Sequence, residues 1–507
     1  MAFTPEQEAI IASNARLVRA NAFAGTGKST TLRGVASARP SERALLIAFN
    51  KSIQLEAEAT FPRNVKCRTS HALAFRDFGR LYTAGGKLQG DLKPFHIASI
   101  TSSATTQLPA PVARIFDQRV IETVKAFLVS ADDALGAKHV VIGDSPAEEK
   151  YLSDVTVLAA AVRVWAAMQD TASPVPMLHD GYLKLYQLSQ PRLAFDMILA
   201  DESQDLNPTL QAILAAQTCR VLYVGDSSQA IYGFRGAHNA METVNADATF
   251  YLTGSFRFGA DVAEVANRIL ARKGITVALR GLGEPTEVIH GPLEEARGSA
   301  FISRTNAAVF DKAFRAVCSG TQVAYVGGIH TYKFEVGEDI SRLQQFGPGV
   351  VRNPFIASFK DFEELTEYAG AVNDRELNGW AKMVENYGAR RFDGALQQIR
   401  AAALQYDSAD PAQRDALVAV TAHRSKGLEF DRVELAENFI DMLDEETGQL
   451  RDFSDASREE IEEVNLLYVA ATRARKQLAV NQSIVQLFDP ALVDEAAPTP
   501  AIEAAMR

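Results

Sequence analysis

The chain has 507 residues and a formal net charge of −11, and 47% of its residues are hydrophobic against 23% charged. These fractions are typical of globular proteins, and the length exceeds what one ordinary core supports, so we expect about three or four structural units. No run approaches the ~18 consecutive apolar residues of a membrane span, and the N-terminus lacks a basic region followed by an apolar stretch. The sequence therefore argues against a membrane or secreted protein and predicts a cytoplasmic one, or a nuclear one if the host has a nucleus.

The negative charge is unevenly distributed. Between Asp441 and Glu463 there are ten acidic residues against two arginines, a pattern that indicates a solvated loop and helix start. Nucleic-acid binding depends on local clusters of Lys and Arg rather than on the sum, so the net charge does not exclude it. Cys67, Cys219 and Cys318 have no metal-ligand spacing, and we expect three buried, reduced thiols.

Short apolar runs rich in β-branched residues alternate with helical patterns, which predicts parallel sheets covered by helices. The expected strands are Leu17–Ala22, Ala44–Phe49, Met197–Ala200, Val221–Val224, Ser299–Ser303 and Leu417–Thr421. Two mostly helical stretches interrupt this alternation and predict one insertion in each of two sheet domains. The predicted division is a first sheet domain at 1–86 and 190–254 with an insertion at 87–189, a second at 255–329 and 415–488 with an insertion at 330–414, and a flexible tail at 489–507.

A glycine-bearing turn, Phe23–Ser29, follows the first expected strand and precedes a helical pattern. This context predicts a P-loop, in which backbone N–H groups cradle phosphates at a helix N-terminus. Lys28 would reach the β- and γ-phosphate oxygens, and Ser29 would hold Mg²⁺. Ala22 stands where the strict pattern has glycine.

A pair of acids at the end of a later strand indicates hydrolysis rather than binding alone. The apolar run that ends at Ala200 leads directly into Asp201 and Glu202. An acid at this place can hold the Mg²⁺, and a second one beside it can orient or deprotonate the attacking water. We assign Asp201 to the metal and Glu202 to the catalytic base.

The segment Asp201–Asp205 together with Val224–Ala237 resembles motifs II and III of the UvrD/Rep/PcrA DNA helicases of superfamily 1. Further matches follow in the family's order: Phe3–Gln7 (Q motif), Phe49–Lys51 (Ia), Thr69–Ala74 (the next DNA-contacting motif), Ser255–Arg257 (IV), Thr421–Phe430 (V) and Glu463–Ala474 (VI). The resemblance runs from Phe3 to about Leu478 and implies two RecA-like P-loop domains with parallel sheets, each carrying a mostly helical insertion. The segments His179–Lys184 and Ala48–Ser52 are most similar to the F-box DNA helicase branch, although no F-box precedes Phe3.

The resemblance also implies roles at a nucleotide that lies, in the family, between the two RecA-like domains. Arg257 and Arg473 match arginines that stabilise the γ-phosphate, Gln229 matches its sensor in motif III, and Thr30 replaces a frequent arginine, which predicts one-sided base stacking. Gln7, Phe256 and Glu429 match contacts to adenine, to the base face and to ribose. The residues assigned to ATP are Gln7, Ala24, Gly25, Thr26, Gly27, Lys28, Ser29, Thr30, Phe256 and Glu429, and the implied cofactors are ATP and Mg²⁺.

Other matched positions contact DNA in the family. Stacking platforms and backbone contacts allow single strands to be bound without sequence preference. The implied aromatic platforms are Phe49, Tyr232 and Phe234, and the implied polar contacts are Asn50, His71, Arg235 and His423. Motif III carries Gln229 and two of these aromatics in one short loop, which predicts a route from hydrolysis to stepping.

The function implied is an ATP-dependent 3′→5′ DNA helicase that translocates on single-stranded DNA, with single-strand/duplex junctions as partners, in repair, recombination or replication. We expect a monomer that is cytoplasmic and nucleoid-associated, with no membrane contact. A DNA-stimulated ATPase that displaces proteins with little unwinding is the alternative. A nucleotide switch without hydrolysis would not need Glu202, Arg257 and Arg473 together, and nothing in the sequence indicates recognition of an RNA 2′-OH.

Overall fold

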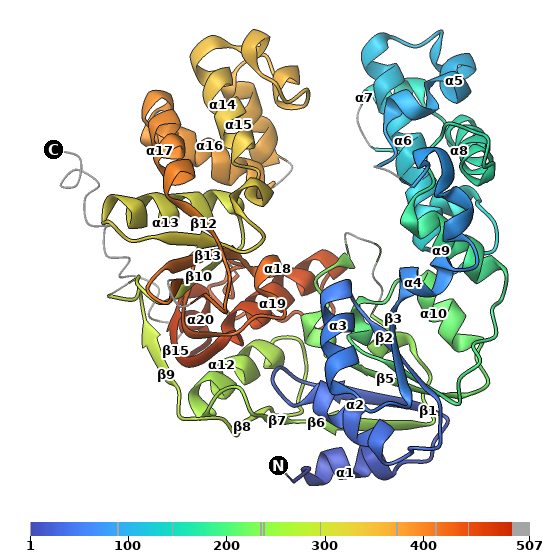
Figure 1. Ribbon diagram of the computed structural model, residues 1–507. Coiled ribbons are helices and arrows are strands. Elements are labelled where there is room, and N and C mark those ends of the chain that lie inside the picture. The colour runs from blue at the N-terminus through green and yellow to red at the C-terminus, as the bar shows by residue number, and fades with distance from the viewer. Residues whose placement is uncertain are drawn as a thin grey trace. The chain divides into compact units, whose positions relative to one another are not determined.

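The computed structural model describes residues 2–88, 91–143, 146–233, 236, 239–294, 296–371, 374–410, 413–444 and 446–488 (Figure 1). The chain divides into two units: one extends to Leu252 without Phe23–Thr26, and the other consists of Phe23–Thr26 and the chain from Thr253 onward. Across the described part, no helix is both long and apolar enough to cross a membrane. The predicted α/β class with parallel sheets is confirmed.

The first unit contains a six-stranded sheet in the order β3-β2-β4-β5-β1-β6, in which all neighbouring strands are parallel. Its strands are β1 (Leu17–Ala22), β2 (Ala44–Ala48), β3 (Val65–Thr69), β4 (Met197–Ala200), β5 (Arg220–Gly225) and β6 (Ala248–Leu252). Because β1, β4 and β5 are neighbours, the turns that follow them meet at one edge of the sheet. Motifs that are far apart in the sequence are thereby brought together.

Helices cover both faces of this sheet, as expected for a parallel sheet whose strands β2 and β4 are continuously apolar and buried. On one face, Leu32 and Val35 of α2 pack against β1 and β5. On the other face, Ile198 and Tyr223 belong to a core shared with α5, α6, α8 and α9, which includes Trp165. The helices of the unit are α1 (Pro5–Ala12), α2 (Lys28–Ser37), α3 (Lys51–Thr60), α4 (Ser70–Phe75), α5 (Pro94–Thr105), α6 (Ala110–Val129), α7 (Pro146–Tyr151), α8 (Asp154–Gln169), α9 (His179–Leu188), α10 (Pro208–Ala215) and α11 (Ala240–Thr243). Figure 1 shows α5–α8 gathered in one lobe.

The second unit contains a seven-stranded parallel sheet in the order β12-β11-β13-β10-β14-β15-β9. Its strands are β9 (Glu287–His290), β10 (Ala300–Ser303), β11 (Val323–Tyr325), β12 (Ala403–Gln405), β13 (Leu417–Thr421), β14 (Phe430–Leu435) and β15 (Ala474–Val480), and β7 (Gly254–Ser255) pairs separately with β8 (Arg280–Gly281). The helices α12 (Ala260–Ala271), α13 (Asn306–Cys318), α18 (Ala422–Ser425), α19 (Arg458–Ala471) and α20 (Gln482–Phe488) belong to this sheet domain.

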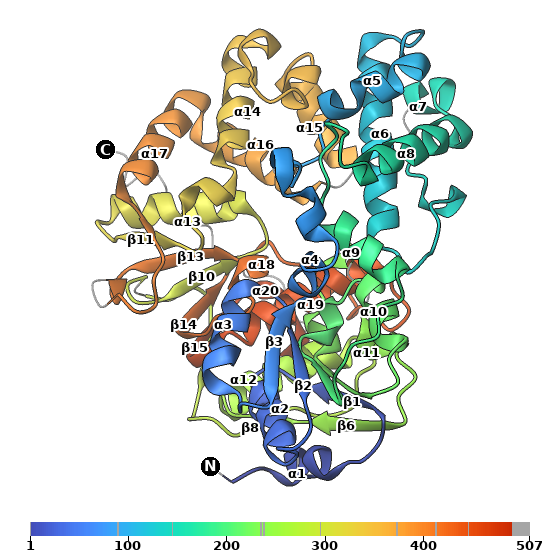
Figure 2. The same cartoon turned by 45° about the vertical axis from the view of Figure 1, so that its right-hand side comes forward.

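A helical group packs on α13 in the same unit (Figure 2). It comprises α14 (Phe334–Phe346), α15 (Phe362–Ala371), α16 (Arg375–Tyr387) and α17 (Ala389–Ala402). Its centre is aromatic: the ring centroid of Phe310 lies 4.6 Å from that of Phe392 and 5.8 Å from that of Trp380, which is fully buried. A Cβ atom at Gly337 would lie 2.6 Å from the rings of Trp380 and Phe392, so only glycine lets α14 approach them this closely.

Each of the six strands predicted from the sequence is present. The second ends at Ala48, one residue earlier than predicted, which leaves Phe49 outside the sheet and 41% exposed. The prediction of three buried thiols holds for Cys67, but Cys219 is only partly buried. The prediction is wrong for Cys318, which is exposed at the last residue of α13. The division into domains and insertions stays a prediction, and the tail from 489 to 507 lies outside the described residues.

Candidate active site

The turn after β1 has the backbone conformation that a phosphate-binding loop needs. Gly25 and Gly27 have φ angles of +73° and +80°, a region that glycine adopts without strain. Gly27 caps α2, whose first residue is Lys28 and whose first turn contains no acidic residue. Ser29 and Thr30 are exposed in that turn. The N-terminus of α2 therefore offers N–H groups, the positive end of the helix dipole and a hydroxyl to an anion.

The ammonium group of Lys28 faces the acids that follow β4. Its Nζ atom lies 3.2 Å from Oε2 of Glu202, and both side chains are largely shielded from solvent. Burial opposes its charge, but Glu202, Asp226 and Asp201 together raise the pKa of Lys28. The structure thus brings together the lysine and the two acids that the sequence assigned to hydrolysis.

These three carboxylates outnumber the single ammonium group, which is a favourable setting for a divalent cation. Burial and the neighbouring Glu202 raise the pKa of Asp201 to about 6, against the opposing effect of Lys28. Within the described ranges, no three His, Cys, Asp or Glu side chains cluster as a metal site. Mg²⁺ bound with phosphates commonly takes only one or two carboxylates together with waters. Asp201 and Ser29 fit that donor set, and Mg²⁺ would supply charge neutralisation of the phosphates.

Two residues that the sequence reasoning missed extend this cluster toward motif III. The Nε2 atom of Gln204 donates to Oε2 of Glu202 at 2.5 Å, and its Oε1 accepts from the backbone N–H of Asp226 at 3.1 Å. The carboxylate of Asp226 in turn accepts from Nε2 of Gln229 at 2.8 Å. The predicted sensor Gln229 is therefore connected to the predicted base Glu202. In the sequence, the position of Gln204 within the acidic segment Asp201–Asp205 was the signal that could have indicated its role.

Two of the predicted DNA-contacting aromatics lie together in the first unit. The rings of Phe49 and Tyr232 are 5.8 Å apart and inclined by only 14°. Asn50 caps α3, and its Oδ1 accepts from the N–H of Ile53 at 2.9 Å. His71 is the second residue of α4, and its Nε2 lies 3.0 Å from the carboxylate of Asp180.

Two further predicted DNA contacts, Phe234 and Arg235, lie outside the described residues. Gly236 is described and has a φ of +75°. A Cβ atom at Gly236 would lie 2.5 Å from the side chain of Val129, so the end of motif III packs closely against the end of α6.

The second unit contains the predicted motif IV arginine, Arg257. Its Nη1 donates to the carbonyl of Thr472 at 3.0 Å, and its Nη2 lies 3.1 Å from Oε1 of Glu429. Its Nε is buried and has no hydrogen-bond partner among the described residues. A buried guanidinium nitrogen without a partner is costly, and an anionic ligand would satisfy it. Arg257 and Glu429, assigned to different parts of the nucleotide, thus pair with each other.

The remaining predicted residues of this unit differ in exposure. Arg473 is 1% exposed, and its guanidinium donates to the carbonyls of Val469 and Leu428. Phe256 is 47% exposed, as a ring that stacks on a base requires, and its N–H donates to the carbonyl of Gly25. His423 lies partly buried in α18.

The Q-motif glutamine has a structural role that the sequence also signals. Thr4 and Gln7 form a reciprocal capping box at the start of α1, in which the Thr4 N–H donates to Oε1 of Gln7 at 3.0 Å. Gln7 is 3% exposed. Because Oε1 of Gln7 is used in the capping box, its Nε2 is the group that would donate to an adenine base. Thr30 stands where the family often has an arginine. Arg33 donates to the hydroxyl of Thr30 at 3.1 Å and so places a guanidinium beside that position.

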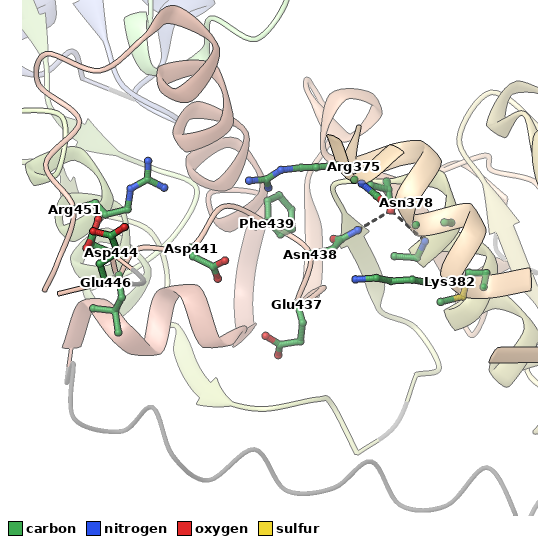
Figure 3. Close-up of a pocket in the computed structure, with 17 residues that line it drawn as sticks. Arg375, Asn378, Lys382, Glu437, Asn438, Phe439, Asp441, Asp444, Glu446 and Arg451 are labelled. Atoms are coloured by element: carbon green, nitrogen blue, oxygen red, sulfur yellow. Dashed lines mark hydrogen bonds between the residues drawn. The ribbon is translucent and has the colours of Figure 1, made fainter. Parts of the chain in front are cut away.

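A separate cavity of about 910 Å³ lies in the second unit, at the carboxyl ends of β10 and β14 (Figure 3). Its lining carries both charges, from Arg375, Lys382, Glu437, Asp441, Asp444 and Arg451 among others. No predicted site residue lines it. The assigned chemistry is therefore not located there.

Comparison with known proteins identifies two family models that match parts of this chain. The UvrD-like helicase C-terminal domain matches residues 354–483, and the UvrD/REP helicase N-terminal domain matches residues 177–248. The chain carries UvrD-like helicase domains. The predicted UvrD/Rep resemblance is confirmed, and the α/β architecture is consistent with two RecA-like domains.

Three relatives extend the comparison. F-box DNA helicase 1 of Gallus gallus is 32% identical over 96% of this chain and 49% of its own length. F-box DNA helicase protein 1 of Schizosaccharomyces pombe is 31% identical over 96% and 58%, and DNA helicase IV of Escherichia coli is 23% identical over 52% and 46%. The UvrD-like chain is thus homologous to the F-box DNA helicases but spans about half their length.

Proposed function

We propose that the chain is an ATP-dependent DNA helicase that translocates 3′→5′ on single-stranded DNA. The observation that carries this proposal is the continuous set of contacts from Lys28 through Glu202, Gln204 and Asp226 to Gln229. It joins the phosphate-binding turn to the loop that carries Tyr232. Such a connection supports coupling between hydrolysis and movement of that loop.

In the proposed reaction, Lys28 and the N-terminus of α2 hold the β- and γ-phosphates, and Glu202 orients and deprotonates the attacking water. Arg257 and Arg473 stabilise the charge that develops on the γ-phosphate. An arginine in this role accelerates turnover by ~10³–10⁵. The unsatisfied Nε of Arg257 supports this assignment because it lacks an acceptor that a phosphate would provide.

The proposed track is single-stranded DNA, entered at single-strand/duplex junctions. Stacked, solvent-accessible aromatics such as Phe49 and Tyr232 offer platforms for bases without reading their sequence. Asn50, His71, Arg235 and His423 are the proposed backbone contacts, with Phe234 as a third platform. We further propose a monomer that works in DNA repair, recombination or replication, in the cytoplasm and in association with the nucleoid.

Tailed duplexes test polarity and unwinding together. A duplex with a 3′ single-stranded tail should be unwound in the presence of ATP, and one with only a 5′ tail should not. The same DNAs carrying streptavidin on the tail should be cleared of it with the same polarity. Preference for the 5′ tail would contradict the proposed direction. Streptavidin displacement without strand separation would show that protein displacement, and not unwinding, is the main activity.

A further inference from the structure

Gln204 is a buried polar residue that connects the acids after β4 with the loop after β5. It is 1% exposed, and its single amide group contacts both the carboxylate of Glu202 and the backbone N–H of Asp226. The amide can be oriented in only one way. Nε2 must face the carboxylates of Glu202 and Asp205, at 2.5 and 3.5 Å, and Oε1 must face the N–H group. The reversed amide would place oxygen against carboxylates and NH₂ against N–H.

The residues around Gln204 restrict the position of its amide group. A Cβ atom at Gly225, the last residue of β5, would lie 2.4 Å from Oε1 of Gln204. Glycine is therefore required at that position for the amide to reach Asp226. On the other side, Glu202 adopts a left-handed conformation with φ 49°, which is strained for a residue with a side chain. Strain of this kind persists where neighbouring contacts hold the residue in place.

The two groups that Gln204 joins have different assigned tasks. Glu202 is the proposed base, whereas Asp226 begins the loop in which Gln229 and Tyr232 lie. The loop's carboxylate also accepts from the N–H of Ser228 at 3.0 Å, so a shift of the loop moves Asp226 as a body. Because the Gln204 amide has fixed length, such a shift changes where it holds the carboxylate of Glu202.

We propose that Gln204 is a positioning residue that makes the placement of the catalytic base depend on the motif III loop, and hence on DNA. This inference rests on the proposed function, since it requires that the loop contacts DNA. Gln204 touches neither nucleotide nor DNA in this account. It acts by donating one hydrogen bond to Glu202 and accepting another from Asp226.

Two substitutions at Gln204 separate its two contacts. Gln204→Met keeps the length of the side chain but removes both hydrogen bonds. Gln204→Glu keeps the acceptor for Asp226 but places a carboxylate against Glu202. With single-stranded DNA present, both should lower the kcat of ATP hydrolysis by ~10–100-fold, as loss of a partner that orients a catalytic group commonly does. The KM for ATP should stay within about threefold, because the P-loop is unchanged.

The matched control is Gln217→Met. Gln217 is 4% exposed in the same unit, and its amide makes three comparable backbone contacts, to Leu193, Pro191 and Ile213. It should lower the melting temperature about as much as Gln204→Met, yet keep wild-type kcat and wild-type stimulation by DNA. All variants are compared at a temperature at which circular dichroism shows them folded.

The decisive quantity is the ratio of ATPase kcat with and without single-stranded DNA. For Gln204→Met this ratio should fall toward one, while Gln217→Met keeps the wild-type ratio. A wild-type ratio and kcat in Gln204→Met, or parallel losses in both Met variants, would overturn the inference. If the wild-type enzyme itself shows no stimulation by DNA, the proposed function fails instead, and the DNA-dependent part of the inference fails with it. In that case, normal kcat in both Gln204 variants would also refute the inference that Gln204 positions the catalytic base Glu202.

Discussion

The buried acid Asp201 should make the nucleotide-free wild-type protein less stable than a variant with an uncharged side chain at this position. A carboxyl whose pKa rises from 3.8 to about 6 on folding costs the folded state about 3 kcal/mol at neutral pH. Asp201→Asn removes this cost and keeps the Oδ1 atom that accepts from the N–H of Glu202 at 2.9 Å. For a unit of this size, ~2–4 °C of melting temperature corresponds to 1 kcal/mol, so we expect a gain of roughly 6–12 °C.

The pH dependence gives this prediction its sign. Between about pH 4 and 6 the unfolded chain has Asp201 ionised while the folded one keeps it protonated, so wild-type stability falls as pH rises through that window. The excess stability of Asp201→Asn should therefore be small near pH 4 and complete above pH 6. Thermal melts with EDTA and without nucleotide measure it, and Asp196→Asn serves as the control. Arg43 lowers the pKa of Asp196, so its amide variant should show no gain. An equal or lower melting temperature for Asp201→Asn at pH 8 would refute the reasoning.

Three further outcomes are expected. Lys28→Ala should abolish hydrolysis, whereas Glu202→Gln should still bind a fluorescent ATP analogue but lose turnover; near-normal turnover would refute the base assignment. Phe49→Ala should weaken single-strand binding by ~1–3 kcal/mol in fluorescence anisotropy while its melting temperature changes little, because the ring is 41% exposed; a large drop in melting temperature would indicate a packing role instead. Single-strand affinity should fall with salt despite the net charge of −11, and a flat response from low to moderate salt would exclude a basic groove.

The fold was largely predictable because its strands are short, apolar and rich in β-branched residues between polar turns. Met197–Ala200 is buried on both faces and was predicted with its observed ends. The end of β2 was missed at Phe49 because a large apolar residue at a strand end resembles a core residue in sequence. Its exposure depends on the neighbouring motif III loop, against which it stacks through Tyr232. Sequence periodicity contains no information on that neighbour.

The site was predictable where one short segment carries the chemistry, as in Gly25–Ser29 and Asp201–Glu202. It was not predictable where the chemistry depends on strand order. The contact between Gln204 and Asp226 exists because β4 and β5 are neighbours in the sheet. The pairing of Arg257 with Glu429 joins residues 172 positions apart, and two individually recognisable residues gave no sign that they face each other.

Steady-state ATPase activity of the wild-type protein with single-stranded DNA, with single-stranded RNA and without nucleic acid tests the central claim most directly. The account predicts that hydrolysis rises strongly with DNA, because the loop proposed to contact DNA is connected to Glu202 through Gln204 and Asp226. RNA should stimulate less, or not at all. Equal rates under all three conditions would contradict the proposal of a motor driven along single-stranded DNA.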